Sequence, residues 1–404
     1  MKEIFIISTM QILNGRTAGS QRVLKIAKSL SLGDTNVFIC SFTEISKGPF
    51  IKSVLYPNIF HLTTKNNGRS SIFHLFYFIF SLNRFIKARK SNSVIYLYPT
   101  SKIIHDFIYL IYFKLIQKYK FFCEINELRS TNLYTKTPPA NDLKKVLFYI
   151  KFPFIFLIYK VSEVQIFFYD GVIVISTSLE KYLSRYTKKK IRIPILCDIS
   201  NSINFKQLPY NRNEPFKICF SGTISTRKEG FNLLFEAMKK VNQKKNVELH
   251  MYGFISEGDN KEINHLIEKH HLQGKIFYHG HFDPEDLPVE FLKYNLLILP
   301  RPSTRQNKYG FSTKLSEYMV SGIPVLVTDV SDNRLFIKDG HNGYIIPPGS
   351  LSEMTTKINE IIDNYNFDNS IVSNAYATSK NEFDYKLYTQ KLINFFFNET
   401  IPFN

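Results

Sequence analysis

A lysine and a glutamate stand three residues apart in the stretch KYGFSTKLSEYMVSGIPVLVT, which runs from Lys308 to Thr328. Residues at this spacing lie on one face of a helix, so Lys314 and Glu317 could act on the same molecule. An ammonium group can bind a phosphate, and a carboxylate can accept hydrogen bonds from a ribose diol. The pair therefore predicts a nucleotide site, and the simpler alternative is a surface ion pair on an ordinary amphipathic helix.

A second glycine-containing loop carries another lysine. In FSGTISTRKEGFNLLFEA a predicted strand ends at Gly222, Lys228 follows six residues later, and a helix is expected to begin near Gly230. Where a parallel strand leads into a helix, the free N–H groups and the positive end of the helix point at the ligand. A phosphate needs open backbone and a nearby cation, and both loops supply them.

Other chemistry-bearing residues form no recognisable set. His270 with His271, and His279 with His281, lack partners at a metal-ligand spacing. The acids of TDVSDN (328–333) favour a helix cap, and the sequence has no DxD motif at a strand end, no GxSxG elbow and no Walker loop. We therefore expect a metal-independent site with no cofactor, in which the nucleotide belongs to a substrate. The four cysteines lack a CxxC spacing, which predicts buried free thiols.

Alternating strands and helices must position these loops. In the first half, apolar runs predict strands at 3–8, 36–42, 93–98, 120–125 and 171–176. After a polar, Asn-rich linker at 200–215, predicted strands at 216–222, 247–253, 276–280, 296–300 and 324–328 alternate with helices at 230–242, 260–271, 313–321 and 350–365. A chain of 404 residues suits two domains. The pattern predicts an α/β fold with two doubly wound, Rossmann-like domains facing each other across a cleft.

Positive charge is concentrated in the first half. Residues 1–200 hold 29 Lys and Arg against 11 Asp and Glu, a balance of +18, whereas residues 201–404 hold 23 of each. Aromatic stretches at 71–90, 103–122 and 143–160 contain charged residues, so none predicts a spanning helix. Basic amphipathic helices on an anionic membrane surface account for them better than helices packed on a sheet with lysines in water.

Two other partners or locations are disfavoured. The sequence has no compact basic motif with base-reading or stacking residues, which argues against nucleic acid. The N-terminus has no long apolar signal segment, which favours a cytoplasmic protein.

Several stretches resemble the retaining glycosyltransferases of family four, group 1 enzymes with the GT-B fold. The resemblance rests on GTISTRKEGFNLLFEA, on the segment from YGFISEG to LILP, on KYGFSTKLSEYMVSGIPVLVT and on DGHNGYIIPPG, and it covers about residues 216–365. In the first half only NGRTAGSQRVLKIAKSL, GVIVISTSLEKYL and IPILCDIS resemble the family. The resemblance implies an acceptor-binding domain at 1–200, a nucleotide-sugar domain at 216–375, and a C-terminal helix at 376–404 that crosses back to the first domain.

The resemblance also implies which residues bind the donor. Lys228 matches the lysine that contacts the donor phosphates, and Glu317 matches the glutamate that holds the ribose, so both are expected to activate the donor. The other implied binding residues are Gly19, Gly222, Thr223, Arg227, Tyr252, Gly253, Tyr309, Gly310, Phe311, Ser312, Thr313 and Lys314.

Three positions of the donor loops depart from the family pattern. Tyr309 replaces the first glutamate of the paired motif, Thr223 replaces the arginine after the strand-end glycine, and Glu229 is inserted after Lys228. Arg227 or Lys314 could supply the missing cation.

The family's histidine on the first domain has no counterpart. It would fall near Asn126, where Glu124 and Glu127 are the nearby polar candidates for a base, and Glu127 is a weak one. In a retaining transfer the leaving phosphate can take the acceptor's proton, which needs less from a protein base.

Together these features predict a hexosyltransferase that moves sugar from a nucleotide-sugar donor to a lipid-linked or cell-surface glycan. It is expected to be cytoplasmic and peripheral on the inner face of the cytoplasmic membrane. One rival is a nucleotide-sugar epimerase of the same fold, which needs acid and base groups on both sides of one sugar. Another is a catalytically silent sugar-nucleotide-binding protein, which Tyr309 and Thr223 keep open.

Overall fold

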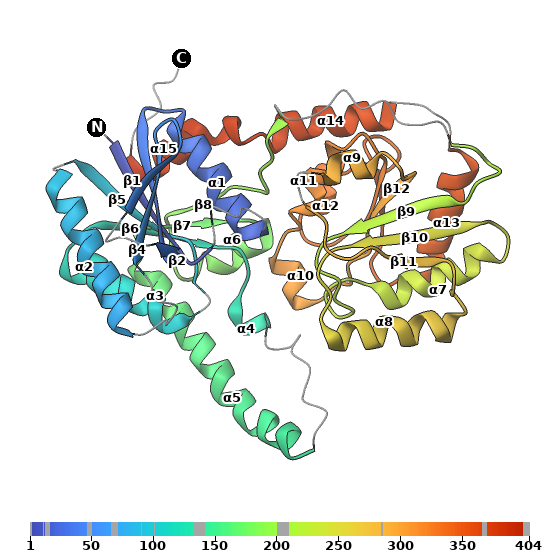
Figure 1. Cartoon of the computed structure of the whole chain (residues 1–404), viewed down its shortest axis with the longest axis horizontal. Helices are drawn as coiled ribbons and strands as arrows, with labels where there is room; N and C mark the ends of the chain where they lie inside the picture. The colour runs from blue at the N-terminus through green and yellow to red at the C-terminus, as the bar shows by residue number, and fades with distance from the viewer. Residues whose placement is uncertain are drawn as a thin grey trace. The chain divides into compact units, whose positions relative to one another are not determined.

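The computed structural model describes residues 2–10, 12, 17–46, 51–65, 72–89, 91–100, 102–132, 142–199, 210–283, 286–365 and 370–398. They belong to two compact units, one made of Met1–Leu196 with Tyr385–Asn404 and one made of Cys197–Asp384 (Figure 1). Most of the predicted linker at 200–215 lies outside the described residues.

The first unit is built on an eight-stranded sheet in the order β3-β4-β2-β1-β5-β6-β7-β8. Every neighbouring pair is parallel except the antiparallel pair β3 and β4. The strands are β1 (Lys2–Ser8), β2 (Thr35–Ser46), β3 (Ile51–Tyr56), β4 (Ile59–Lys65), β5 (Asn92–Leu97), β6 (Lys120–Ile125), β7 (Gly171–Val174) and β8 (Lys190–Arg192). The prediction missed β3 and β4, a hairpin whose turn is Pro57 and Asn58, and the short β8.

Helices cover this sheet. They are α1 (Ala18–Ser31), α2 (Ile72–Arg89), α3 (Ile103–Tyr109), the π-helical η1 (Leu110–Ile116), α4 (Arg129–Asn132), α5 (Asp142–Val164), the 3₁₀ turns η3 (Gln165–Phe168) and η5 (Tyr385–Tyr388), α6 (Thr177–Leu183) and α15 (Thr389–Phe397). Thr17 caps α1, because its hydroxyl accepts from the N–H of Ser20 at 3.1 Å while the Ser20 hydroxyl accepts from the N–H of Thr17 at 3.0 Å.

The last helix, α15, completes the core of the first unit. Leu392 and Phe396 are fully buried in the same cluster as β1 and α1, and the Phe396 ring meets the Tyr96 ring at 5.4 Å between centroids. A Cβ on Gly33 would lie 2.0 Å from Cδ1 of Ile393, so a larger residue there would displace this side chain of α15. The returning segment begins at Tyr385 rather than at 376, because α14 (Ser370–Glu382) belongs to the second unit.

The first unit exposes two groups of large apolar side chains. The α5 apolar surface consists of Leu143, Val146, Leu147, Tyr149, Ile150, Phe154, Leu157, Ile158, Val161 and Val164, with Phe154 67% exposed. In Figure 1, α5 extends away from the sheet of its own unit. The α2–η1 apolar surface consists of Ile72, Phe73, Phe76, Tyr77, Phe80, Ile111, Leu115 and Ile116. The two helices of this second surface meet where the Phe80 and Tyr112 rings lie 5.4 Å apart.

A groove beside the α2–η1 apolar surface is lined by Lys87, Lys118 and Lys120. This lysine groove lies where β5 and β6 begin, at the amino edge of the sheet. No helix in the described part of the chain is both long and apolar enough to cross a membrane.

The second unit is built on a six-stranded parallel sheet in the order β11-β10-β9-β12-β13-β14. Its strands are β9 (Phe216–Ser221), β10 (Val247–Tyr252), β11 (Ile276–Tyr278), β12 (Leu296–Leu299), β13 (Val325–Thr328) and β14 (Tyr344–Ile346). Its helices are α7 (Phe231–Asn242), α8 (Glu257–His270), α9 (Leu287–Phe291), α10 (Arg305–Tyr309), α11 (Lys314–Met319), α12 (Asn333–Phe336), α13 (Leu351–Asp363) and α14. The prediction missed β14 and the short helices α9, α10 and α12.

Candidate donor site

The strand order of the second unit places its two glycine loops side by side. In chain order the sheet runs 3-2-1-4-5-6, so the winding reverses between β9 and β12. In open α/β sheets the ligand binds outside the carboxyl ends of the strands at this reversal. The loops that follow β9 and β12 flank it, and they carry Lys228 and the segment leading to Lys314.

Glycines bring the backbone after β9 close to the backbone after β10. The N–H of Gly222 donates to the carbonyl of Tyr252 at 2.8 Å, and a Cβ on Gly253 would lie 2.0 Å from the carbonyl oxygen of Gly222. Gly222 has φ +133°, and a Cβ there would lie 1.8 Å from Cε of Lys314. The sequence therefore needs Gly222 so that the Lys314 side chain can pass under the loop.

A buried ion-pair cluster joins the two loops and α11. Nζ of Lys314 lies 3.1 Å from Oε1 of Glu229, and Arg301 contacts the same carboxylate through Nη2 at 3.0 Å and Nε at 3.1 Å. Glu229 is 1% exposed, and the Lys314 side chain is 12% exposed. Nζ of Lys314 also lies 4.3 Å from the centroid of the Phe220 ring. We refer to Arg301, Glu229 and Lys314 as the Glu229 cluster.

The pKa values of Glu229 and Lys314 both lie below their ordinary values, for different reasons. Burial raises the pKa of Glu229, but Arg301 and Lys314 outweigh that effect and lower the pKa to about 2. Burial lowers the pKa of Lys314 to about 8; Glu229 opposes this shift, while Arg301 and Lys228 add to it. Arg301 and Lys314 share the single carboxylate of Glu229, and Lys228 lies near enough to affect the pKa of Lys314. The carboxyl edge of β9 therefore carries a net positive charge.

The two side chains of the predicted Lys314 and Glu317 pair have different surroundings. Lys314 turns inward to Glu229, whereas Glu317 is exposed on α11. Thr223 and Arg227 are exposed on the loop after β9, and Lys228 is half-buried. The loop after β9 thus exposes one hydroxyl-bearing and one cationic side chain at the point where the winding reverses.

The side chains of two predicted binding residues contact other protein residues. The hydroxyl of Tyr252 lies 2.7 Å from Oε1 of Glu290 and 2.5 Å from the hydroxyl of Tyr294. Phe311 is buried and stacks on Phe336, with 5.5 Å between ring centroids. Tyr252 can offer the site its backbone, and Phe311 stabilises the loop.

The other residues of the second predicted loop lie directly before or at the start of α11. Gly310 ends α10, Tyr309 is half-buried, and Thr313 precedes Lys314 without a side-chain capping bond. The hydroxyl of Ser312 is buried and has no hydrogen-bond partner among the described residues. Because an unpaired buried hydroxyl is uncommon, Ser312 is a candidate contact for a bound group.

Arg301 was not predicted. It directly follows the apolar run of β12 and stands between Pro300 and Pro302. A charged residue at the end of a buried strand needs a partner, which is the signal that could have identified it. Among the described residues no group of three or more His, Cys, Asp or Glu is placed to hold a metal ion.

In the first unit, Glu124 is held in a buried ion pair. Its Oε1 lies 2.8 Å from Nε of Arg22, and its other oxygen accepts from the hydroxyl of Tyr96. Arg22 also donates to the carbonyls of Ile193 and Pro194. Glu124 is 0% exposed, so its role is to fix Arg22 and it is a poor candidate for a base.

The remaining predicted residues of the first unit lie near the carboxyl ends of β1, β5 and β6. A Cβ on Gly19 would lie 2.9 Å from Sδ of Met10 and 3.3 Å from the hydroxyl of Tyr98, to which the Asn126 amide donates at 3.0 Å. Glu127 is half-buried and lines a cavity with residues of α4 and α5.

The second half of this chain matches a known protein family. Residues 202–378 match the family model described as glycosyl transferases group 1. The chain is 28% identical over 173 residues to the UDP-N-acetylglucosamine–peptide N-acetylglucosaminyltransferase GtfA subunit of Streptococcus gordonii, covering 43% of this chain and 32% of that protein. It is 24% identical over 252 residues to the capsular polysaccharide biosynthesis glycosyltransferase CapM of Staphylococcus aureus, covering 59% of this chain and 64% of that one. The alignment with the first relative therefore spans only about a third of its length.

Solved structures are similar over nearly the whole chain. The TM-score is 0.70 against sucrose-phosphate synthase from Thermosynechococcus elongatus, at 16% identity and 97% coverage of both chains. It is 0.64 against HepE from Anabaena in complex with UDP, at 16% identity, covering 98% of this chain and 99% of that one. These likenesses confirm the predicted GT-B fold.

Proposed function

We propose that this chain transfers a hexose-type sugar, with retention, from a nucleotide-sugar donor to a lipid-linked or cell-surface glycan, which the match of residues 202–378 to the group 1 glycosyl transferases supports. The observation that carries the proposal is the Glu229 cluster at the reversal of the second sheet. A diphosphate placed there contacts Lys314 and Lys228. Three cations, Arg301, Lys314 and Lys228, lie near the single carboxylate of Glu229, so two positive charges remain to balance the diphosphate.

Each cation of the site has a distinct part in this proposal. Lys314 is held in place by Glu229 and Arg301, so its ammonium group is preorganised to stabilise charge on the leaving diphosphate. Lys228 contacts the diphosphate from the exposed loop, and Arg227 supplies the cation that Thr223 lacks. Glu317, exposed on α11, accepts hydrogen bonds from the ribose.

We propose that the acceptor's proton goes to the leaving phosphate and that no metal ion takes part. The buried ion pair of Glu124 supports this assignment, because it removes one of the two carboxylates that could act as a base. The donor would be a substrate, and no cofactor is required.

We propose further that the first unit lies on the anionic inner face of the cytoplasmic membrane. The α2–η1 apolar surface beside the lysine groove supports this, since apolar side chains can enter the headgroup boundary while lysines contact anionic headgroups. The α5 apolar surface adds a second face of the same kind.

Product analysis tests the transfer. The full chain is incubated with a panel of nucleotide sugars and a lipid-linked acceptor, and the anomeric configuration of the product is read by NMR. Transfer with the donor's configuration is expected. Interconversion of the free nucleotide sugar would instead identify the epimerase, and nucleotide binding without any turnover would identify the silent binding protein.

A further inference from the structure

The lysine groove of the first unit lies away from the edge of the sheet where substrates bind. Its volume is about 330 Å³, within the range of about 300–1,000 Å³ typical of small-molecule pockets. It lies where β5 and β6 begin, and β6 has six residues. At about 3.3 Å per residue, the groove is therefore about 17 Å from the carboxyl edge, which is the edge that open α/β sheets use for their ligands.

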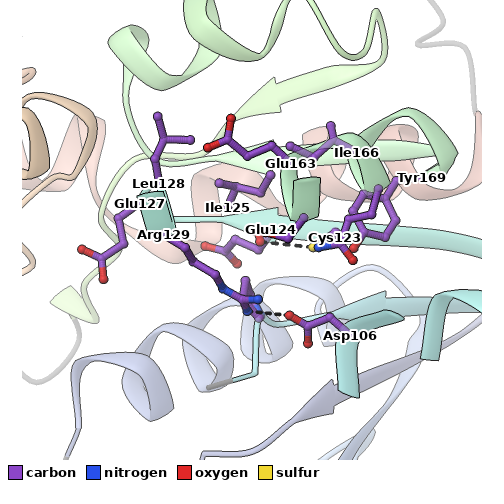
Figure 2. Close-up of a pocket in the computed structure, with 13 residues that line it drawn as sticks. Asp106, Cys123, Glu124, Ile125, Glu127, Leu128, Arg129, Glu163, Ile166 and Tyr169 are labelled. Atoms are coloured by element: carbon purple, nitrogen blue, oxygen red, sulfur yellow. Dashed lines mark hydrogen bonds and ion pairs between the residues drawn. The ribbon is translucent and has the colours of Figure 1, made fainter. Parts of the chain in front are cut away.

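The two ends of β6 differ in charge. The cavity at the carboxyl end has Arg129 as the one cation among its described wall residues, against four carboxylates, Asp106, Glu124, Glu127 and Glu163 (Figure 2). The lysine groove at the amino end has three lysines and no acidic residue in the described part of its wall. An anion that approaches the first unit is therefore favoured at the amino end of the strand.

The protein does not neutralise the three lysines of the groove. None of them forms an ion pair within the described part of the chain. Two acids at the same edge of the sheet already have partners, since Glu3 lies 2.5 Å from Nη2 of Arg89 and Asp170 lies 2.6 Å from Nζ of Lys114. Three unbalanced positive charges in one groove favour a ligand with a phosphate group, which accepts several charge-assisted hydrogen bonds.

The backbone at Lys118 indicates that the fold does not require a lysine there. Lys118 follows the end of η1 with φ +60°, in the left-handed region that glycine usually occupies after a helix. The N–H of Tyr119 donates to the carbonyl of Phe113 at 3.0 Å, which fixes this conformation. Because glycine would adopt it at lower cost, what the lysine contributes at this position is its charge.

A hydroxyl oxygen of the same wall can accept a hydrogen bond from a ligand. The Ser91 hydroxyl donates to Oε2 of Glu3 at 2.5 Å and lies 2.9 Å from the hydroxyl of Ser93. Because Glu3 takes the single proton of Ser91, Ser93 donates to Ser91, and the Ser93 oxygen keeps a lone pair for another donor. Such an oxygen repels a phosphate oxygen and accepts from a hydroxyl group. The wall therefore suits a ligand that carries hydroxyl groups beside its phosphate.

We propose that the lysine groove binds one phosphate ester that carries hydroxyl groups, with the phosphate on Lys118 and Lys120 and a hydroxyl on Ser93. Glycerol phosphate is the simplest such group, either free or as the headgroup of phosphatidylglycerol. The exposed Leu115 and Ile116 lie three and two residues before Lys118, so the acyl chains of a lipid would have apolar side chains beside the groove. Binding in the groove does not rest on the proposed function.

Pairs of probes with equal charge test the proposal on the full chain. Glycerol 1-phosphate is compared with methyl phosphate by calorimetry. Phosphatidylglycerol is compared with phosphatidylmethanol by co-sedimentation, at the same mole fraction in phosphatidylcholine vesicles. In at least one pair the glycerol-bearing member is expected to bind about two- to tenfold more tightly, as one hydrogen bond provides. A preference in the soluble pair identifies a free phosphate ester as a ligand, and a preference confined to vesicles identifies the lipid headgroup.

Matched variants locate the binding. Ser93→Ala removes the acceptor oxygen without a change of charge, so the two members of a pair should bind equally. Lys118→Gly removes a cation and relieves the left-handed backbone, so both members should bind about fivefold less tightly while the Tm stays equal to that of the parent or rises. Lys181→Gln is the control, because Lys181 is exposed on α6 outside the groove, and loss of its charge should leave the binding unchanged.

Two results would overturn the site. Equal binding, or no binding, of both members in both pairs would show that the lysines act only as surface charge. A preference that survives Ser93→Ala and Lys118→Gly would place the ligand elsewhere. Calorimetry with UDP on Lys118→Gly measures the donor site with the groove impaired, so a failure of the proposed function is detected separately from a failure of the groove.

Discussion

The titration of Lys314 predicts how nucleotide binding depends on pH. Burial lowers its pKa to about 8; Glu229 opposes this shift, while Arg301 and Lys228 add to it. A diphosphate that needs the ammonium form will bind less tightly as pH rises through this value. The dissociation constant should be nearly constant between pH 7 and 7.5 and should then increase about tenfold for each pH unit above about 8, which is about 1.4 kcal/mol per unit.

Calorimetric titration with the preferred nucleoside diphosphate between pH 7 and 9 measures this dependence. Lys314→Met is the matched control: it keeps the length of the side chain without its charge, and its weak binding should not vary with pH. Glu229→Gln removes the group that raises the pKa of Lys314, so the break should move below pH 8. An affinity in the parent that stays constant up to pH 9 would show that Lys314 does not contact the diphosphate.

The same cluster makes a prediction for folding stability. The pKa of Glu229 is lowered to about 2, so the unfolded chain binds a proton more readily than the folded chain between pH 4.5 and 2, and the stability from this group is lost as pH falls through that window. For Lys314, whose folded pKa lies below its unfolded value, the cost of burying charge is present below pH 8 and disappears as pH rises from 8 to 10.5. Glu229→Gln leaves two buried cations unpaired and should cost about 3–5 kcal/mol at pH 7, measured by urea unfolding.

Four further outcomes are expected. Glu317→Ala should weaken nucleotide-sugar binding by about 1.5–3 kcal/mol through a lost hydrogen bond to the ribose, and calorimetry that finds unchanged affinity would refute the assignment. Lys228→Ala should reduce kcat more than it raises KM, because charge on the diphosphate develops during transfer; an equal fall in ground-state binding would contradict this role. A chain ending before Tyr385 should lose transfer activity and show lower thermal stability of the first unit while still binding nucleotide, so full activity would exclude a need for α15. The parent protein should co-sediment with phosphatidylglycerol vesicles. Co-sedimentation should fall at high salt, and in the double variant Lys118→Glu with Lys120→Glu. No co-sedimentation of the parent protein at low salt would exclude a membrane role for the lysine groove.

The sequence predicted the second unit well because its signals are local. Buried parallel strands are continuous apolar runs, and those of β9 and β12 are ended by Gly222 and Pro300, so their boundaries could be predicted to within one residue. The loops after them were recognised because glycine and lysine stand at fixed spacing in one short stretch.

The ion pairs could not be predicted, because their partners lie far apart in the chain. Glu229 bonds to residues 72 and 85 positions away, and in the sequence it was interpreted as an insertion. Glu124 was interpreted as a possible base, although an acid inside the apolar run of β6 requires a buried partner. That partner, Arg22, is 102 positions away on α1, and only the packing of α1 on the sheet brings the two together.

Because α15 belongs to the first unit, that unit is assembled from two separate pieces of chain. During synthesis, Cys197–Asp384 emerges as one continuous stretch, whereas the first unit must wait for Leu392 and Phe396 before its core is complete. At about 5–20 residues per second, the 188 residues from 197 to 384 impose a delay of about 10–40 s. The later half is therefore expected to reach its native state on the ribosome before the earlier half does. Throughout that interval the side of α1 that α15 later covers is open to chaperones.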